Sequence, residues 1–321
     1  MNNTKNKKVS VVIATYKRGE LLSSCLRSLK KSKFSETCSF EVVVVDDGGG
    51  LSETLIKEHS DLSVKWESLN ANQGQPAAQA RGVELSTGDY YAFIDDDAEA
   101  DEGWVESVHN YFCKNPDVGA ILGRVEPFST KKLLQRTRQQ IYDKRHNTYL
   151  NPDYVSSLKL KYSLEISTKT GLSNHVSGGN FAIRKEIFDE IGGFVPNIRL
   201  GSDDLISSRL LEAGIPIGYN PEMVIYHHHN ESYKVLFKNN IHEGRDRVRR
   251  KRMDGVRIST LLRNAIFDFI TAPFRVISFP QILKADRFLI RAYFVFTMIQ
   301  YFDSWGQFIQ CLRELSKKED V

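Results

Sequence analysis

The sequence predicts an α/β protein built on a mostly parallel sheet with helices on both faces. Short strand-like runs recur through the first hundred residues, and three of them are almost wholly apolar, as strands buried on both faces of a sheet are. Stretches with apolar residues at helical spacing separate these runs from one another. Strands that alternate with helices in this way are typical of a parallel sheet.

The N-terminal elements alternate strictly. Leucines at helical spacing predict a helix after the first strand, and two more helices are expected at 51–62 and 75–88. Gly88 closes the last of these, which is a common signal for the end of a helix. The expected strands lie at 9–14, 40–50, 63–69 and 90–94.

Beyond residue 100 the alternation is looser. The segment 130–175 is polar and poorly periodic, so we expect loops or an insertion there. Residues 177–194 fit a strand followed by a helix. The other expected elements are helices at 104–115 and 202–214 and strands at 118–128 and 217–229. We therefore expect one domain at residues 1–234 and a basic, apolar helical region at residues 235–321.

Composition and charge exclude several classes of protein. The chain has 321 residues and a formal net charge of +4, which is too small to indicate nucleic-acid binding. Its four cysteines are scattered without a CxxC pair, so they predict reduced thiols in a cytosolic protein rather than a zinc site or a disulfide framework. The N-terminus lacks the apolar region of a signal peptide. We therefore expect the protein to act in the cytoplasm, without nucleic acid as a partner.

Three consecutive aspartates, Asp95, Asp96 and Asp97, follow the expected strand at 90–94. In extended backbone successive side chains alternate, so Asp95 and Asp97 are expected on one side and Asp96 on the other. Two carboxylates on one side repel each other unless a cation relieves them, and oxygen ligands favour Mg²⁺ or Mn²⁺. A solvated acidic turn is the alternative.

Polar residues also follow the other three strands of the N-terminal part. They are Thr15 and Tyr16 after the first strand, Asp46 and Asp47 after the second, and Asn72, Gly74 and Arg81 after the third. Each group alone fits ordinary turn chemistry. Because ligands of open α/β sheets bind beyond the carboxyl ends of the strands, four polar strand ends together indicate one binding crevice.

Five stretches, in this order and spacing, match a known family. They are VSVVIATYKRGELLSSCLRSL, VVVVDDGGG, NANQGQPAAQARGVELSTGDYYAFIDDDAE, SGGNFAIRKEIFDEIGGF and SDDLISSRLLEAG. Over roughly residues 8–230 the chain resembles the family-two glycosyltransferases, which have the GT-A fold. The resemblance implies transfer of a sugar from a nucleotide diphosphate donor to an acceptor hydroxyl, with inversion at the anomeric carbon.

The resemblance also implies roles for the strand ends. Asp95 and Asp97 match the family's DxD signature, in which the first acid lies near the ribose and the last binds the metal on the diphosphate. The metal would be Mn²⁺ or Mg²⁺, and Asp95 is a second candidate ligand. The residues expected to hold the donor are Thr15, Tyr16, Asp46, Asp47, Arg81, Asp95 and Asp96.

Transfer also needs a base, because a sugar hydroxyl is a weak nucleophile. In the family the base is the Asp of an ED pair before a helix. Anchoring on Arg209 places Asp203 over that Asp and Ser202 over the Glu, while Asp204 takes a variable position. Asp203 and Asp204 both remain candidates, with Asp203 favoured. The alternative is that both merely stabilise the start of a helix.

Two further motifs match the family. The stretch with Gly178, Gly179 and Asn180 matches a glycine-rich loop that lines the donor and acceptor site, although a tight turn at a strand edge is the alternative. Some relatives complete the metal site with a histidine after the strand expected at 217–229. His227 and His229 lie on one face there and are candidate ligands, unless they are simple surface residues.

The C-terminal region is basic and apolar. Eight basic residues precede or begin its apolar helices: Arg245, Arg247, Arg249, Arg250, Lys251, Arg252, Arg257 and Arg263. Arginines beside amphipathic helices suit peripheral contact with an anionic membrane at the inner face of the cell. The alternatives are a helical subdomain packed on the core or on a second subunit, which would make a homo-oligomer, and neutralisation of the donor diphosphate.

Rival functions fit less well. A sugar-nucleotide pyrophosphorylase would need a glycine-rich, arginine-bearing loop that is absent at 9–22, and GGGLSETL does not fit the GxGxxG of a dehydrogenase. A receiver domain would not account for the further carboxylates. A binding module without turnover remains open, and Ser202 favours it. We expect a UDP-sugar donor, with guanosine and thymidine donors open, and a saccharide or lipid-linked saccharide as acceptor.

Overall fold

The computed structural model describes residues 7–129, 131, 135, 172–195, 201–228, 232–253, 255–277 and 287–316. These residues form two compact units. The first ends at residue 228; the second begins after it and also takes in residues 129, 131 and 135. Most of the segment expected to form loops at 130–175 lies outside the described residues, and so does His229.

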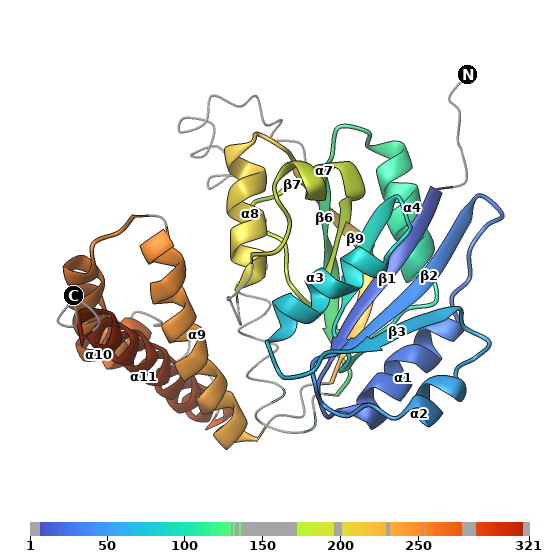
Figure 1. The fold of residues 1–321 in the computed structure, drawn as a ribbon. Coiled ribbons are helices and arrows are strands. Elements are labelled where there is room, and N and C mark those ends of the chain that lie inside the picture. The colour runs from blue at the N-terminus through green and yellow to red at the C-terminus, as the bar shows by residue number, and fades with distance from the viewer. Residues whose placement is uncertain are drawn as a thin grey trace. The chain divides into compact units, whose positions relative to one another are not determined.

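A twisted sheet forms the centre of the first unit (Figure 1). Its first four strands are parallel, whereas β8 runs antiparallel to both of its neighbours. In order across the sheet the strands are β3 (Val64–Ser68), β2 (Cys38–Asp46), β1 (Lys7–Thr15), β4 (Tyr90–Ile94), β8 (Asn180–Arg184), β6 (Ala120–Pro127), β9 (Ile217–His227) and β5 (Ala98–Ala100), and β7 (Leu172–Ser173) pairs with β9. The predicted α/β fold is confirmed, with a sheet that is parallel in one half and mixed in the other.

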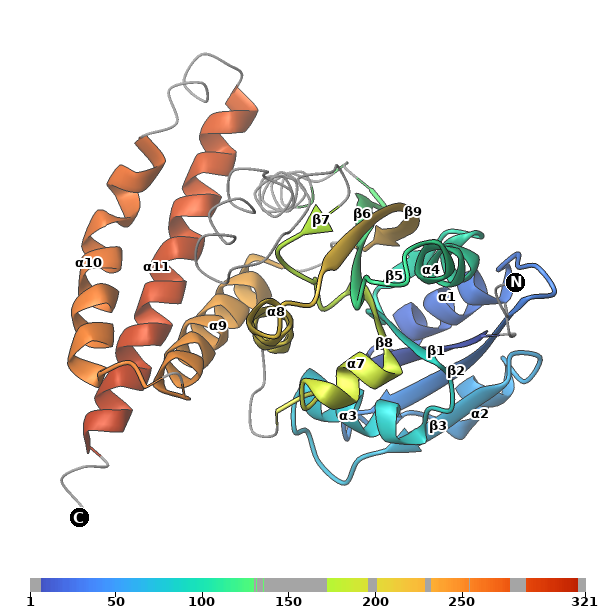
Figure 2. The same ribbon diagram turned by 90° about the horizontal axis from the view of Figure 1, so that it is seen from above.

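Helices cover both faces of this sheet (Figures 1 and 2). The odd-numbered residues of β1, such as Val11, pack in one core with the helices of one face, and Val12 packs in a second core with helices of the other. The first face carries α1 (Gly19–Lys30), α2 (Glu53–Lys57) and α4 (Trp104–Lys114); the other carries α3 (Gln75–Leu85), α7 (Lys185–Glu190) and α8 (Ser202–Glu212).

Close packing on both faces follows from the sequence. Helix α1 buries Leu22, Leu26 and Leu29, which recur at helical spacing, and burial of each such side chain stabilises the fold by about 1.5–3 kcal/mol. On the other face α3 approaches β1 closely because Gly82 has no side chain. A Cβ at that position would lie 2.5 Å from Val12 Cγ1. The elements that hold the strand ends are therefore fixed from both sides.

The topology brings several strand ends to one edge of the sheet. In the parallel pair β1 and β2, Thr15 lies opposite Asp46. The neighbouring parallel strand β4 ends at Ile94, opposite the first residue of the antiparallel strand β8. The end of β9 then pairs with β5, which places His227 opposite Ala98. The predicted polar strand ends thus share one edge of the sheet.

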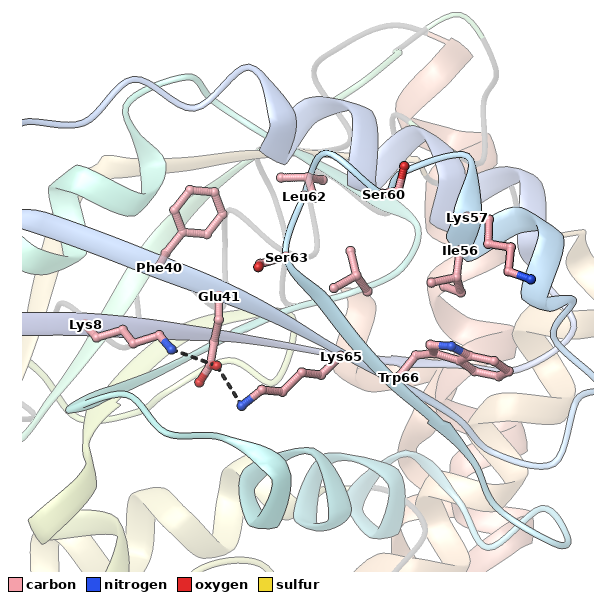
Figure 3. A pocket seen from close by; sticks show the side chains of 11 residues that line it. Lys8, Phe40, Glu41, Ile56, Lys57, Ser60, Leu62, Ser63, Lys65 and Trp66 are labelled. Carbon is pink, nitrogen blue, oxygen red and sulfur yellow. Dashed lines mark hydrogen bonds and ion pairs between the residues drawn. The ribbon is translucent and has the colours of Figure 1, made fainter.

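A pocket of about 510 Å³ lies elsewhere, beside the edge strand β3 (Figure 3). Glu41 is buried on its wall and accepts ion pairs from Lys8 and Lys65, both at 2.9 Å. The Ser10 hydroxyl and the Thr87 N–H also donate to it. Burial would raise the pKa of Glu41, but these donors outweigh it and hold the pKa well below its usual range.

Glu41→Gln is expected to lower the free energy of unfolding at pH 7 by about 2 kcal/mol, because a charged acceptor of several hydrogen bonds is lost. The lowered pKa gives stability that is present above the unfolded-state pKa and is lost as the pH falls. The gap in melting temperature between wild type and variant should therefore narrow below about pH 4.3. Thermal unfolding from pH 3 to pH 7 measures this difference in melting temperature. Glu36→Gln, at an exposed position, is the control and should melt as the wild type does. Equal melting at pH 7 would show that Glu41 does not stabilise the fold.

The second unit contains three helices among its described residues: α9 (Tyr233–Met253), α10 (Ile258–Ile277) and α11 (Arg287–Ser316). Leu236 of α9 packs with Val295 and Ile299 of α11. Further along, the Arg247 guanidinium donates to the buried Asp303 carboxylate at 2.8 Å. This confirms the helical C-terminal region. None of the helices in the described part of the chain is long and apolar enough to cross a bilayer.

Candidate metal and active site

Asp95, Asp97 and His227 converge at the shared sheet edge. His227 Nε2 lies 3.6 Å from Asp95 Oδ2 and 3.3 Å from Asp97 Oδ1. One ligand atom from each of the three residues lies within 4.8 Å of the other two. Two carboxylates and one imidazole at this separation form a donor set that fits a divalent cation such as Mn²⁺ or Mg²⁺.

The backbone explains why these side chains meet. Asp95, Asp96 and Asp97 form a turn between β4 and β5, in which the Ala98 N–H donates to the Asp95 carbonyl. Asp95 and Asp97 reach His227, and Asp96 points to β1 instead. Strand alternation predicted that Asp96 would point away from Asp95 and Asp97. The structure shows this arrangement, although the three residues lie in a turn and not in a strand.

Asp96 is fully buried and is held by one hydrogen bond and one ion pair. The Thr15 hydroxyl donates to Oδ2 at 2.6 Å, and Arg18 Nη2 lies 2.6 Å from Oδ1. Arg18 also pairs with Asp97 at 2.7 Å and so bridges the two acids. Burial raises the pKa of Asp96 to about 7, against the opposing charge of Arg18. Arg18 therefore opposes the repulsion between Asp96 and Asp97.

Asp95 has its own partners. Burial would raise its pKa, but His227, Arg18 and the Gln75 amide, which donates to Oδ1 at 2.7 Å, together lower it. An ionised Asp95 is the form that binds a metal cation.

Asp46 and Asp47 shape the neighbouring loops. The donors to Asp46 are the N–H groups of Gly49, Gly50 and Leu51 and the Ser68 hydroxyl. The donors to Asp47 are the Asn72 amide and the N–H groups of Gln73 and Gly74. Both carboxylates are buried at the predicted edge, with Thr15 between them and Asp96. Tyr16 lies next to them and is exposed.

Two residues that were predicted to bind the nucleotide-sugar donor do not direct their side chains at the aspartates. Arg81 makes a two-pronged contact with Glu67 at 2.7–2.8 Å and also pairs with Glu84, so the structure does not bring it to the aspartates. The buried Asn180 side chain accepts from Trp104 Nε1 and donates to the carbonyls of residues 124 and 223, which ties β8 to α4, β6 and β9. At this position the backbone, rather than the side chain, borders the site.

Gly178 and Gly179 connect the cluster of Asp95, Asp97 and His227 to α8. The Asp95 N–H points at the Gly179 carbonyl at 3.4 Å, and the Gly178 N–H donates to Asp203 Oδ2 at 3.1 Å. A Cβ at Gly179 would collide with the Asp95 carboxylate, whereas one at Gly178 would meet nothing closer than 3.6 Å. Close approach at Gly179 therefore requires glycine.

Gly179→Ala is expected to weaken Mn²⁺ binding by about 10–100-fold, because the new methyl group displaces the Asp95 carboxylate. Gly178→Ala is the matched control and should bind Mn²⁺ like the wild type. Calorimetric titration of both variants with Mn²⁺ measures the difference. Equal affinity in the two would rule out Asp95 as a ligand fixed by this contact.

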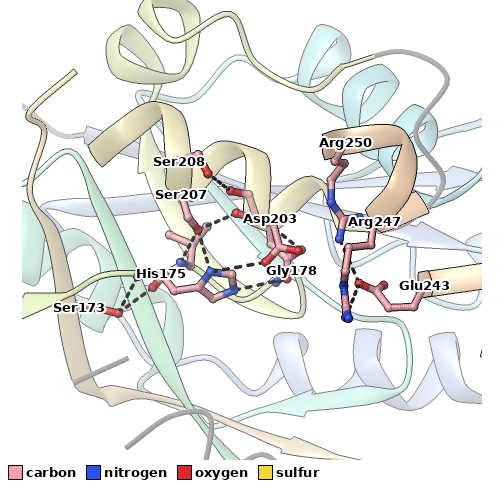
Figure 4. Close-up of polar contacts among 11 residues, drawn as sticks. Ser173, His175, Gly178, Asp203, Ser207, Ser208, Glu243, Arg247 and Arg250 are labelled. Atoms are coloured by element: carbon pink, nitrogen blue, oxygen red, sulfur yellow. Dashed lines mark hydrogen bonds and ion pairs between the residues drawn. The ribbon is translucent and has the colours of Figure 1, made fainter. Parts of the chain in front are cut away.

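Asp203 lies in the first turn of α8, next to His175 (Figure 4). His175 Nε2 is 3.8 Å from Asp203 Oδ2 and His175 Nδ1 is 3.9 Å from Asp204 Oδ1. Burial would raise the pKa of Asp203, but His175 and the Gly178 and Asp204 N–H groups lower it to about 2. Asp204 is the more exposed of the two acids.

Ser207 holds the loop before the glycines against α8. Its hydroxyl donates to the Asp203 carbonyl at 2.6 Å, accepts the Val176 N–H at 3.0 Å and lies 3.1 Å from His175 Nδ1. The loop and the helix therefore fix Asp203 from both sides. An ionised carboxylate held in this way can accept a proton from a hydroxyl placed against it.

Sequence reasoning missed three residues of this site: Arg18, Gln75 and His175. An arginine just past a strand end that shares an edge with three acids is a signal that was available. Gln75 and His175 carry no such signal, because Gln75 begins a helix and His175 lies in a stretch expected to form loops.

Comparison with known proteins identifies the family. The family model described as glycosyl transferase family 2 matches residues 10–192, which is more than half of the chain. The chain belongs to glycosyl transferase family 2. The matched range contains the aspartate triplet, Arg18, His175 and both site glycines, and the resemblance expected from the sequence is confirmed.

Relatives in family 2 are distant. The O-antigen chain rhamnosyltransferase RfbN of Salmonella typhimurium is 25% identical over 238 residues, which are 72% of this chain and 69% of that protein. The glucosyl-dolichyl phosphate glucuronosyltransferase of Haloferax volcanii is 27% identical over 202 residues, 59% of this chain and 56% of that protein. The chain thus spans little more than half the length of the second relative.

Solved structures agree on the fold. The mannosyltransferase PcManGT of Pyrobaculum calidifontis, in complex with GDP-Man and Mn²⁺, superposes with a TM-score of 0.52 at 15% identity, over 98% of this chain and 76% of that one. GalNAc-T7, with UDP, GalNAc and Mn²⁺, gives a TM-score of 0.50 at 16% identity, over 69% and 44%. This family 2 chain therefore has the expected GT-A fold.

Proposed function

We propose that this chain is a metal-dependent inverting glycosyltransferase that moves a sugar from a nucleotide diphosphate donor to an acceptor hydroxyl. The observation that carries the proposal is the convergence of Asp95, Asp97 and His227, with Asp203 joined to them through two glycines. Asp95, Asp97 and His227 suit a cation and the donor diphosphate, and Asp203 suits the acceptor hydroxyl.

Each residue has a role in the proposed reaction. Asp95, Asp97 and His227 would hold Mn²⁺ or Mg²⁺, which when bound stabilises the charge that develops on the leaving nucleoside diphosphate. Asp203 takes the proton of the acceptor hydroxyl. The acceptor oxygen then forms a bond to the anomeric carbon on the face opposite the breaking C–O bond to the diphosphate, and inversion follows from that direction of attack.

Family members support the substrate class. By their names, the relatives described above act on an O-antigen chain and on glucosyl-dolichyl phosphate, and a third, TarP of Staphylococcus aureus, acts on poly(ribitol-phosphate). We therefore propose a saccharide or lipid-linked saccharide of the cell envelope as acceptor. The donor is proposed to be a UDP-sugar. Because the Pyrobaculum calidifontis structure contains GDP-Man, GDP-sugars are also included in the test.

A binding module without turnover is the second candidate. Ser202 favours it, because the glutamate of the family's ED pair is missing there. Such a module would bind donor and metal through the same cluster and transfer nothing.

The test is hydrolysis of a panel of UDP-, GDP- and dTDP-sugars by the purified chain, with Mn²⁺, with Mg²⁺ and with chelator. We expect slow hydrolysis of one donor that stops with chelator, and this would name the sugar. Metal-dependent binding without hydrolysis, even with candidate acceptors added, would favour the binding module. No binding of any donor would contradict both.

A further inference from the structure

Helix α10 is apolar on two opposite sides. Leu261, Ala265 and Ala272 are buried, and their spacing places them on one side of the helix. Ile266, Phe267 and Ile270 project from the other side and are 44–61% exposed. Large apolar side chains that stay exposed on one side of a helix favour contact with a partner that excludes water.

Helix α11 presents a second exposed apolar line. Phe294, Met298, Trp305 and Leu312 are spaced four, seven and seven residues apart, which aligns them on one side of the helix. They are 40–63% exposed.

The two lines meet. Helices α10 and α11 lie side by side within the second unit (Figure 2). The half-exposed Phe269 ring of α10 packs edge-on against Tyr301 at 5.0 Å and lies 6.4 Å from the Trp305 ring. We call this continuous surface the apolar face; it comprises Ile266, Phe267, Phe269, Ile270, Phe294, Met298, Trp305 and Leu312. Contiguous exposed side chains of this size mark an interaction site rather than ordinary surface.

The exposed charged side chains described on these helices and just before α10 are positive. Arg257, Arg263 and Arg313 are exposed, and Arg263 lies on the same side of α10 as Phe267 and Ile270. The acidic side chains in the described parts of α10 and α11 are less exposed than these arginines. Asp303 is buried beside Arg247, and Asp268 and Glu314 are only partly exposed.

We propose that the apolar face docks on an anionic lipid surface, with its aromatic side chains in the interface and its arginines against the headgroups. This inference goes beyond the proposed function and does not rest on it. A second copy of the chain is the competing occupant. Self-association through this face would bring two sets of arginines together, whereas an anionic bilayer complements them.

The experiment is co-sedimentation of the full chain with vesicles of phosphatidylcholine alone or mixed with phosphatidylglycerol. We expect binding to the mixed vesicles that weakens with salt and is at least about tenfold tighter than to phosphatidylcholine alone. The double change Phe267→Ser and Ile270→Ser should weaken binding by about tenfold or more. Arg263→Glu, which keeps the apolar side chains, should weaken only the phosphatidylglycerol-dependent part.

Phe34→Ser, at a 47% exposed phenylalanine of the other unit, is the matched control and should bind as wild type does. Melting temperatures verify that each variant folds. Absence of vesicle binding, or binding that neither the double variant nor the lipid charge changes, would overturn the proposal. A dimer in sedimentation velocity that the double variant dissociates, without vesicle binding, would assign the face to a second copy instead. Donor hydrolysis by the double variant is expected to be unchanged, so the result is separate from the test of the proposed function.

Discussion

Asp203→Asn is expected to lower kcat for sugar transfer by about 10²–10⁴-fold while the donor still binds. Asparagine keeps the shape of the side chain, and its oxygen can still accept the Gly178 N–H that fixes Asp203 at 3.1 Å. It cannot take the acceptor proton. Because Asp203 does not belong to the metal cluster, the affinity for Mn²⁺ should stay unchanged.

The measurement is kcat for the donor found by the hydrolysis panel, beside donor affinity from calorimetry. Asp204→Asn is the matched control, since that acid is one residue away and more exposed. We expect it to lose less than about tenfold, because its side chain is 52% exposed, whereas that of Asp203 is 28% exposed and accepts the Gly178 N–H. Reversal of the two results would make Asp204 the base.

Asp97→Asn is expected to weaken Mn²⁺ binding by at least about 100-fold, since direct ligands matter more than the residues that support them. Asp97 is buried, lies 3.3 Å from His227 Nε2 and is one of the two carboxyl groups that Arg18 bridges. Donor turnover should fall with the metal and recover in part at high Mn²⁺. Calorimetry with Mn²⁺ and turnover against Mn²⁺ concentration measure both effects.

Glu99→Gln controls for loss of charge near the site. Glu99 lies two residues further on, and its carboxylate contacts His228 at 2.8 Å rather than His227. Its loss should leave Mn²⁺ affinity unchanged. If both variants bound Mn²⁺ as tightly as the wild type, the cluster of Asp95, Asp97 and His227 would not be the metal site.

Local sequence patterns predicted the part of the site that depends on strand ends. Apolar runs that stop at acidic residues placed Asp46 and the aspartate triplet at one sheet edge, because parallel strands end together. The position of His227 came from the family resemblance, since the pairing of β9 with β5 links residues more than a hundred positions apart and leaves no local pattern.

Long-range partners account for what the sequence did not predict. In the sequence Arg18 resembles a surface residue, but the fold brings it to Asp96. The position of His175 depends on Ser207 of α8, which contacts the loop that contains it. Arg81 follows the end of β3, as a residue that binds the sugar donor would, yet Glu67 on β3 itself holds its guanidinium. The antiparallel β8 inside the sheet was also not predicted, because strand direction depends on chain routing and not on local composition.

The central claim is that a divalent cation on Asp95, Asp97 and His227 binds the donor diphosphate. The most direct measurement is calorimetric titration of UDP, GDP and dTDP into the full chain, with Mn²⁺ and with chelator. We predict that one nucleoside diphosphate binds with Mn²⁺ and at least about tenfold more weakly with chelator, because the cation offsets the charge of the diphosphate. Equal affinity in both conditions would contradict the claim.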